Sequence, residues 1–276
     1  MQASEINFYK NSNLLRLNTI KMIFNGPTRT GHIASSLSLG EIVNYLFKYK
    51  IFPNKKKRNF LVLSKGHAAP ILYLAYKNAG FVSSKDIKTF RSYGSKLQGH
   101  PDKRRLKILD SGSGALGQGL SISIGYALSA KLNKTNQKSY CIVGDGELQE
   151  GQIWEAAMYA GSKKINNLCA IIDANRFQNE FLVKRTLNIE NIKEKWKSFG
   201  WNFVTIDGHN FQHLRKAFNK FKKSKKPFLI YAKTIKGKGI SFMENNNFWH
   251  SGIMKKEHFD TAVAELKKQI KSNKMK

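Results

Sequence analysis

The sequence predicts an α/β fold in which a parallel sheet is covered by helices on both faces. Short apolar runs alternate with helix-like segments along the chain. These runs are continuously apolar, as is typical of strands that are buried on both sides. With 276 residues, of which 41% are hydrophobic, the chain can build a large core. We therefore expect residues 1–276 to form one domain that binds its ligands at the carboxyl ends of the strands.

The first regular element that the pattern predicts is a helix over Ser36–Tyr49. Its apolar residues recur at helical spacing, at Leu39, Ile42, Val43, Leu46 and Phe47. Ser38 and Glu41 have the spacing of a capping box, which predicts that they cap the start of this helix.

Strands and helices then alternate to the end of the sequence. Apolar runs predict strands at Phe60–Leu63, Ser139–Val143, Leu168–Ile172, Phe203–Ile206 and Phe228–Ala232. Helical patterns are found at Ala68–Asn78, Leu116–Leu132, Ile153–Ala160, Ile192–Phe199 and His213–Phe221. A final amphipathic helix carries Phe259, Val263, Leu266 and Ile270.

Composition argues against a membrane or secreted protein. The sequence contains no run of eighteen apolar residues, and Met1–Asn13 lacks the pattern of a signal peptide. The two cysteines, Cys141 and Cys169, each lie in an apolar run that predicts a buried strand. Isolated buried thiols are typical of a reducing compartment, so we expect a cytoplasmic protein.

The formal net charge of +30 is extreme and suggests a polyanionic partner such as nucleic acid. However, the lysines are scattered over the whole length and far outnumber the arginines. Nucleic-acid surfaces more often concentrate arginine and aromatic residues on one face. Compositional drift is therefore the favoured interpretation, and nucleic acid is not the expected partner.

The strongest motif joins two neighbouring strands. One strand leads directly into Gly144-Asp145-Gly146, and the next ends at Asp173-Ala174-Asn175. Glycines let the backbone approach a phosphate closely and donate N–H groups to it. The Asp145 carboxylate and the Asn175 amide oxygen are hard ligands, suited to Mg²⁺ or Ca²⁺ shared with a diphosphate. An ordinary Asp-Gly turn is the alternative, but the strands and the spacing favour a metal–diphosphate site.

The segments around this motif resemble the diphosphate-binding domain of transketolases. The likeness begins with "GDGELQEGQIWEAAMYAG" and "IIDAN", and it extends in order over nearly the whole chain. The other matching segments are "GHIASSLSLGEIVNYLF", "FLVLSKGHAAPILY", "GSKLQGHPD", "GSGALGQGLSISIGYAL", "KWKSFGWNFVTIDGHN" and "AKTIKGKGISFMEN". The chain is most similar to the separately encoded N-terminal subunits of split transketolases. The resemblance implies a thiamine diphosphate-binding fold and thiamine diphosphate as cofactor.

Four histidines lie in the matching segments, at His32, His67, His100 and His250. Singly each could be structural, but together they suggest a site that needs proton donors near neutral pH. The resemblance implies that they line the reactive end of the cofactor as catalytic residues, and that His67 and His250 also contact the cofactor. The other three histidines, His209, His213 and His258, are interpreted as surface or capping residues.

The resemblance also implies further cofactor contacts at Gly114, Leu116 and Glu150, in addition to Gly144, Asp145, Gly146 and Asn175. For Glu150 an ordinary first-turn glutamate favoured by the helix dipole remains an equal alternative. The Phe177 carbonyl is implied as the third metal ligand beside Asp145 and Asn175. Arg176 stands where the family usually has glycine, so it needs a permissive backbone conformation.

The implied reaction is transfer of a two-carbon ketol group from a ketose phosphate to an aldose phosphate. Full-length transketolases are more than twice as long and also carry a pyrimidine-binding domain. We therefore expect a C-terminal partner subunit with that domain, in a heterotetramer in which this chain also contacts a second copy of itself.

Two alternatives stay open. Gly31-His32-Ile33-Ala34-Ser35 also resembles deoxyxylulose-phosphate synthase, another thiamine diphosphate enzyme. The chain could also be a non-catalytic cofactor-binding module or a basic interaction module.

Overall fold

The computed structural model describes residues 2–52, 58–179 and 181–272. The strands are β1 Phe60–Leu63, β2 Ser139–Gly144, β3 Leu168–Ala174, β4 Asn202–Asp207 and β5 Phe228–Lys233. The α-helices are α1 Ala3–Asn25, α2 Ile33–Leu37, α3 Gly40–Leu46, α4 Ala69–Asn78, α5 Ser84–Lys88, α6 Gln118–Leu132, α7 Gly151–Ser162, α8 Val183–Thr186, α9 Ile192–Ser198, α10 Phe211–Lys223 and α11 Lys256–Ser272. Short helical turns lie at Phe47–Ile51, Gly66–Ala68, Gly146–Gln149 and Asn247–His250.

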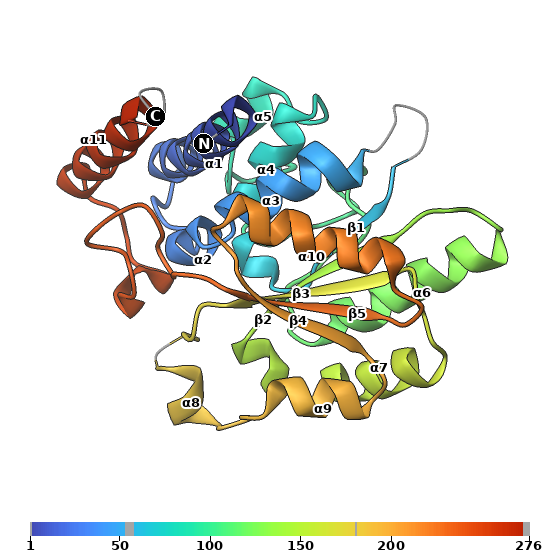
Figure 1. Cartoon of the computed structure of the whole chain (residues 1–276). Coiled ribbons are helices and arrows are strands. Elements are labelled where there is room, and N and C mark those ends of the chain that lie inside the picture. Colours follow the sequence, from blue (N-terminus) through green and yellow to red (C-terminus); the bar gives the residue numbers. More distant parts are fainter. Residues whose placement is uncertain (1, 53–57, 180, 273–276) are drawn as a thin grey trace.

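The strands form one parallel sheet in the order β1-β2-β3-β5-β4. Every strand expected from the sequence is present, and the α/β class is confirmed (Figure 1). The register pairs Gly144 at the end of β2 with Asp173 near the end of β3. The loops that follow β2 and β3 therefore leave the sheet side by side.

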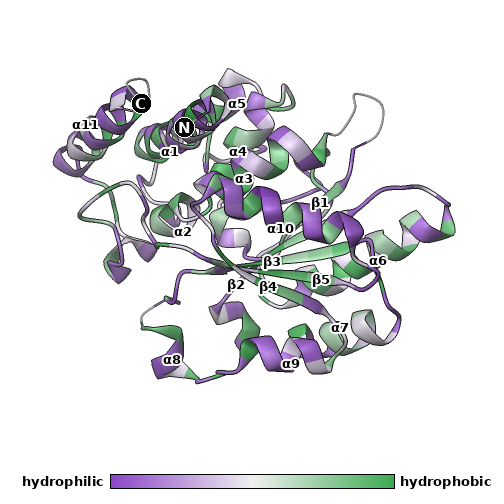
Figure 2. Cartoon of the chain, viewed as in Figure 1, coloured by the Kyte–Doolittle hydropathy of each residue, from purple (hydrophilic) through white to green (hydrophobic). Residues whose placement is uncertain are grey.

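Two hydrophobic cores lie on opposite faces of the sheet. Alternate strand residues point to opposite sides, so Ile142 and Ile171 belong to one core while Val143 and Ile172 belong to the other. The first core is covered by α1, α2, α3, α4, α10 and α11, and the second by α6, α7 and α9 (Figure 1). Hydropathy follows this layering, because the strands are apolar and the outer side of α10 is polar (Figure 2). The central strands are thus buried on both faces, as predicted.

A buried ion pair on the first face corrects two expectations. Glu41 does not cap α3, because its carboxylate pairs with the buried Arg16 of α1 at 2.5 Å and lies 2.7 Å from His209 Nδ1. The Ser38 hydroxyl donates to Asp173 and does not accept from a backbone N–H at the start of α3. The predicted capping box is therefore wrong, because the Glu41 carboxylate is paired with the buried Arg16. His209 is likewise not a surface residue, because its Nε2 also accepts from the Ile235 N–H at 2.9 Å.

The other two histidines that were expected to be surface or capping residues, His213 and His258, have these roles in the structure. His213 is exposed at the start of α10, and its N–H is capped by the Asn210 side chain at 3.0 Å. His258 Nδ1 accepts from the Lys255 N–H at the start of α11, at 3.3 Å, and so has a capping role.

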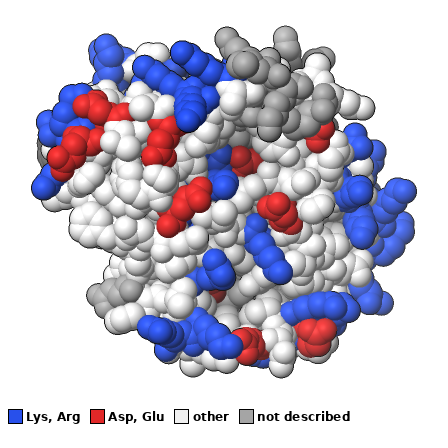
Figure 3. Space-filling model, turned by 60° about the vertical axis from the view of Figure 1, so that its left-hand side comes forward, with Lys and Arg blue, Asp and Glu red and all other residues white. Residues whose placement is uncertain are grey.

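The molecular surface carries mixed charge. On the face shown in Figure 3, lysines and arginines are spread around the outline with acidic side chains among them, and they do not gather in one stripe. Cys141 and Cys169 are both free and buried in the sheet, as predicted. Within the described ranges no helix has the length and apolarity needed to cross a membrane.

Candidate functional site

The Gly144-Asp145-Gly146 loop holds a buried carboxylate at the end of β2. One Asp145 oxygen accepts from the Gly146 N–H at 2.9 Å, and the other accepts from the Arg176 N–H. Burial, together with the neighbouring Asp173 carboxylate, raises the pKa of Asp145 to about 7. The carboxylate is therefore fixed in place by backbone donors from two loops, in surroundings where a cation would stabilise its charged form.

Asn175 at the end of β3 is oriented by its own hydrogen bonds. Its Nδ2 donates to Asp173 at 3.2 Å, and its Oδ1 accepts from the Phe177 N–H at 3.0 Å. Arg176 between them adopts φ 71°, the left-handed conformation that the sequence required. Because only the Arg176 backbone meets Asp145, a side chain at this position is compatible with the loop.

The donors in these two loops fit a hard divalent ion. Asp145 supplies a carboxylate, Asn175 an amide oxygen and Phe177 a main-chain carbonyl, which is the mixed oxygen set that Mg²⁺ or Ca²⁺ accepts. Across the described residues, no three His, Cys, Asp or Glu side chains are grouped to hold a metal by themselves. A metal here would therefore share its coordination with oxygens of a bound diphosphate.

Asp173, immediately before these donors, joins four segments of the chain. It accepts from Lys65 Nζ at 2.5 Å, from the Ser38 and Thr234 hydroxyls, and from Asn175. Both Asp173 and Lys65 are almost completely buried. Burial opposes ionisation, but the Lys65 ammonium holds the pKa of Asp173 below its usual value. Asp173 thus fixes the loops after β1, β3 and β5 relative to one another.

Glu147 joins the two glycine-containing loops at Gly117 and Gly144. Its buried carboxylate accepts from the Gly144 N–H at 3.0 Å, the Gly117 N–H at 2.8 Å and the Ser64 hydroxyl. Burial raises the pKa of Glu147 in spite of these donors. The loop before α6 is thereby tied to the loop after β2.

The four predicted histidines lie close together in space, although the first and the last, His32 and His250, are more than two hundred residues apart in sequence. The His32 ring centroid is 5.3 Å from that of His67, 5.7 Å from that of His100 and 5.2 Å from that of His250. His67 and His250 are 5.3 Å apart. The structure therefore gathers all four into one cluster beside the metal loop.

The charge state of this cluster differs from the expectation of proton donors near neutral pH. Burial, with nearby positive groups, lowers the pKa of His32 to about 4 and that of His250 to about 3. The pKa values of His67 and His100 are lowered as well, again chiefly by burial. Without a bound anion these side chains are neutral imidazoles, which can both donate and accept hydrogen bonds.

Lys236 is a site residue that the motif analysis did not single out. Its side chain is fully buried, and Nζ lies 2.6 Å from Asn247 Oδ1, 3.0 Å from the Gln178 carbonyl and 3.1 Å from His250 Nδ1. Within the described part of the chain it has no carboxylate partner, and burial lowers its pKa to about 7. The nearby Asp145 and Asp173 carboxylates oppose this shift, and an anionic ligand beside Lys236 would stabilise the charged form further. A lysine in the loop after a buried strand, inside "AKTIKGKGISFMEN", was the available clue.

A cavity of about 230 Å³ contains most of the predicted cofactor residues. Its lining includes His67, Leu116, Gly144, Asp145, Gly146, Glu150, Asn175, Phe177 and His250, together with Ser35, Lys65 and Gln178. Gly114 lies just outside, where an added Cβ would come 3.7 Å from His100. Glu150 is exposed at the start of α7, and its side chain makes no capping hydrogen bond there. The helix-dipole alternative for Glu150 stays open, because the residue lies at the N-terminus of α7.

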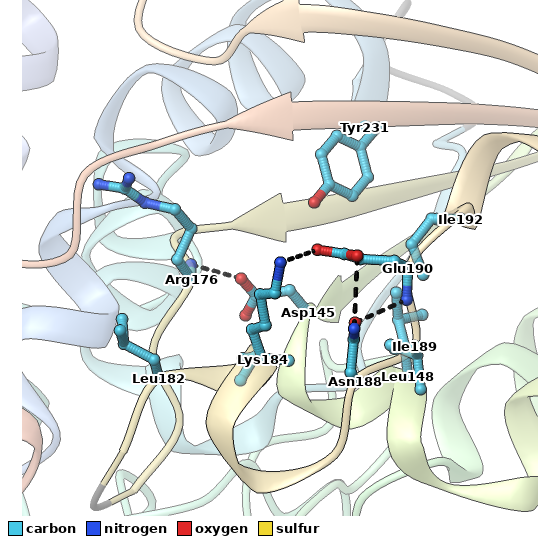
Figure 4. Close-up of a pocket in the computed structure, with 11 residues that line it drawn as sticks. Asp145, Leu148, Arg176, Leu182, Lys184, Asn188, Ile189, Glu190, Ile192 and Tyr231 are labelled. Atoms are coloured by element: carbon cyan, nitrogen blue, oxygen red, sulfur yellow. Dashed lines mark hydrogen bonds and ion pairs between the residues drawn. The ribbon is translucent and has the colours of Figure 1, made fainter.

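A second pocket, of about 340 Å³, adjoins the metal loop from the side of α8 and α9 (Figure 4). Two of its lining residues, Lys184 and Glu190, form an exposed ion pair of 2.5 Å. In Figure 4 the Arg176 N–H is directed at Asp145 while the guanidinium points away from it. Asp145 thus forms part of the wall between the two pockets.

Comparison with known proteins agrees with this site. Residues 11–274 match the family model described as "Transketolase, thiamine diphosphate binding domain". The chain is 37% identical over 275 residues to the 6-deoxy-6-sulfo-D-fructose transketolase subunit SqwG of Clostridium sp. (strain MSTE9), covering 98% of this chain and 99% of the relative. It is 34% identical to one of the subunits of the apulose-4-phosphate transketolase of Phocaeicola vulgatus, covering 98% of this chain and 96% of the relative.

Longer transketolases match over less than half of their length. Human transketolase is 36% identical over 95% of this chain and 42% of its own length. The crystal structure of transketolase from Campylobacter jejuni superimposes with a TM-score of 0.88 at 32% identity, covering 97% of this chain and 43% of that one. The chain therefore belongs to the transketolase family, within its thiamine diphosphate-binding N-terminal part, and resembles separately encoded transketolase subunits over nearly its whole length.

Proposed function

We propose that the chain is the cofactor-binding subunit of a two-subunit transketolase that needs thiamine diphosphate and a divalent metal, Mg²⁺ or Ca²⁺. The reaction is transfer of a two-carbon ketol group from a ketose phosphate to an aldose phosphate. One observation carries the proposal. The metal-type donors Asp145 and Asn175, the buried Lys236 and the four histidines converge at the carboxyl edge of the sheet.

The residues divide the work between holding the cofactor and handling the substrate. Asp145, Asn175 and the Phe177 carbonyl would hold the metal, and the glycine loop and Lys236 would face the diphosphate. When bound, thiamine diphosphate supplies the carbon nucleophile and the electron sink. Leu116, Gly114 and Glu150 border the cofactor's other end in this proposal.

The histidines handle protons and hydroxyl groups. Neutral His32, His67, His100 and His250 can each donate one ring N–H and accept at the other nitrogen, so they can orient substrate hydroxyls. His32 Nδ1 is buried and has no hydrogen-bond partner among the described residues. A substrate hydroxyl or carbonyl at that position would satisfy it, and proton transfer at the same atom fits the ketol reaction.

The need for a partner is supported by the two relatives that are themselves transketolase subunits, which this chain matches over nearly their full lengths. We propose a C-terminal partner that carries the pyrimidine-binding domain, in a cytoplasmic heterotetramer that contains two copies of this chain. The names of those relatives refer to a sulfonated sugar and to a sugar phosphate. They support an anionic sugar as substrate here.

The test mixes this chain, a candidate C-terminal partner, thiamine diphosphate and Mg²⁺ with xylulose 5-phosphate and ribose 5-phosphate. We expect ketol transfer only when both chains are present, at a rate at least ~100-fold above either alone, since each supplies groups that act as a unit. Full activity of this chain alone would contradict the proposed partner. Turnover of pyruvate with glyceraldehyde 3-phosphate, in place of the sugar pair, would contradict ketol transfer.

A further inference from the structure

His209 lies between a buried ion pair and the segment that carries Lys236. Its Nδ1 lies 2.7 Å from the Glu41 carboxylate, and its Nε2 accepts from the Ile235 N–H at 2.9 Å. Because Nε2 accepts, the ring proton is at Nδ1, which donates to Glu41. Both ring nitrogens are therefore used within the protein, and neither is left to meet a ligand.

The Glu41 carboxylate is a fixed anchor for this ring. It pairs with Arg16 at 2.5 Å, and the side chains of Arg16 and Glu41 are only 1% and 6% exposed. Arg16 Nε also donates to the Leu37 carbonyl at 3.0 Å, and Nη1 donates to the Asn13 side chain at 3.1 Å. Burial opposes ionisation of Glu41, but Arg16 and His209 hold its pKa below its usual value. Buried polar groups that are fully hydrogen-bonded are rigid, so this pair fixes the position of the His209 ring.

The His209 ring continues the hydrogen bonding of the sheet beyond its last strand pair. After the paired residues of β4 and β5, the Gly208 N–H donates to the Lys233 carbonyl at 2.8 Å. Two residues further along, the Ile235 N–H meets the ring in place of a strand carbonyl. Gly208 permits this close approach, because a Cβ there would come 2.7 Å from Thr234 Cγ2. Loss of the acceptor would leave a partly buried N–H unpaired, so the ring holds the backbone at Ile235.

Lys236 is the next residue in the chain. Its side chain is fully buried, and its Nζ lies 3.1 Å from His250 Nδ1 at the cofactor cavity. On the other side of Lys236, the Gly237 N–H donates to the Ala34 carbonyl at 3.0 Å. The backbone is therefore held by His209 one residue before Lys236 and by Ala34 one residue after it. The direction in which the lysine side chain leaves the backbone depends on both bonds.

We infer that His209 is a positioning residue for Lys236, because it holds the backbone from which the ammonium reaches His250. The inference rests on the proposed function, in which Lys236 faces the diphosphate. His209 itself touches neither cofactor nor substrate. Its Nε2 affects cofactor affinity through Lys236, whereas its Nδ1 stabilises the fold through Glu41. The two roles are separable, since they belong to different atoms of one ring.

Two substitutions separate the two ring nitrogens. His209→Asn places an amide where Nδ1 was, so it can donate to Glu41 but leaves the Ile235 N–H without an acceptor. His209→Gln reaches the former place of Nε2, so its amide oxygen can accept from Ile235 but no amide donates to Glu41. Each variant keeps one of the two hydrogen bonds and is expected to fold.

Calorimetry measures the affinity of each chain for thiamine diphosphate in Mg²⁺. His209→Asn should weaken binding about 3- to 10-fold, the range for one neutral hydrogen bond, and His209→Gln should weaken it less than about 2-fold. No loss for His209→Asn overturns the inference. An equal or larger loss for His209→Gln also overturns it.

A double-mutant cycle shows whether the effect passes through Lys236. In a Lys236→Met background, His209→Asn should change the affinity by less than about 2-fold, because the ammonium that it positions is absent. A further loss of about 3- to 10-fold in that background would be a general structural effect, and it overturns the inference.

A measurement without cofactor separates this inference from the proposed function. In ligand-free chain labelled with ¹³C-lysine, the Cε signal of Lys236 is identified by NMR from its absence in Lys236→Met. This signal should move in His209→Asn and keep its wild-type position in His209→Gln. The same position in all three proteins overturns the inference. If the wild type does not bind thiamine diphosphate but the signals differ as expected, the proposed function fails and the positioning role stands.

Discussion

Two groups of residues at the site differ in how their charges are satisfied. The first group, here called the floor, consists of Asp173, Glu147 and Lys65. Asp173 and Lys65 form a buried ion pair, and the Glu147 carboxylate accepts from several donors. The cationic wall consists of Lys236 and Arg91, which form no ion pair with a carboxylate within the described residues, together with the neutral imidazole of His32. The charges of the floor are thus satisfied within the protein, whereas in our proposal an anionic ligand satisfies those of the wall.

This difference separates stability from binding. Removing one member of a buried, paired set leaves the others without partners, so changes in the floor should lower the free energy of unfolding. Removing a buried cation that has no counter-ion relieves an unfavourable charge, so changes in the wall should weaken ligand binding while the fold remains stable. The following experiments test this separation, from the largest expected effect to the smallest.

Asp173→Ala should destabilise the protein by roughly 3–5 kcal/mol, because it leaves the buried Lys65 ammonium unpaired and frees two hydroxyl donors. Chemical denaturation of the chain measures this directly. Asp260→Ala, which breaks an exposed ion pair with Lys256, is the control and should change stability by less than about 1 kcal/mol. Adding Lys65→Met to Asp173→Ala should recover part of the loss. A loss below about 1 kcal/mol for Asp173→Ala would contradict the role of the floor.

Lys236→Met should act in the opposite direction on the fold. Affinity for thiamine diphosphate in Mg²⁺ should fall about 10- to 100-fold, because a charge-assisted contact with the diphosphate is lost. The free energy of unfolding of the ligand-free chain should stay the same or rise. Calorimetry and denaturation measure the two effects, and Lys233→Met, exposed at the end of β5, is the control. Destabilisation without weaker cofactor binding would contradict the role of Lys236 in binding and would show that it stabilises the fold.

His32→Gln should change the pH dependence of stability. Burial lowers the pKa of His32 to about 4 in the folded chain. Nearby positive groups lower it further, namely His100, Arg91, Lys236 and Lys65. The rings of His67 and His250 also lie beside that of His32. The unfolded chain, with a pKa near 6.5, therefore binds this proton first. His32 favours folding above about pH 6.5, and this contribution is lost as the pH falls toward about 4.

The wild type should consequently lose stability more steeply than His32→Gln between about pH 6.5 and about pH 4.5. We expect a difference of roughly 0.5–1 kcal/mol per pH unit, less than the full value for one proton because the ring is partly exposed. Denaturation at several pH values measures it. Parallel slopes for the two proteins would show that His32 is not buried as a neutral imidazole.

Sequence pattern was sufficient for the sheet and for the loops that leave it. All five strands are at their expected positions, because short apolar runs between helical segments favour strands of a buried sheet. The parallel order then places Asp145 beside Asn175 at one edge. The gathering of four histidines from distant segments depended on the family resemblance, since spacing along the chain says nothing about contacts between His32 and His250.

Buried polar residues account for most of what the sequence did not predict. Helix α1 was not expected, because Ser12, Asn13, Arg16 and Thr19 interrupt its apolar pattern although all four are buried. Arg16 also explains the wrong capping box, since it draws Glu41 away from the start of α3. The burial of Lys65, Asp173 and Lys236 was not predicted for the same reason, because a buried charged residue has the same appearance in sequence as an exposed one.

The central claim is that Asp145 and the anion-binding wall together hold a metal–diphosphate group. Calorimetry with thiamine diphosphate and Mg²⁺ tests it, comparing wild type with Asp145→Ala and with Asp207→Ala, an exposed aspartate at the end of β4. We predict binding by the wild type and the control, and affinity at least ~100-fold weaker for Asp145→Ala, because metal affinity depends strongly on such ligands. Unchanged affinity in a folded Asp145→Ala chain would contradict the account.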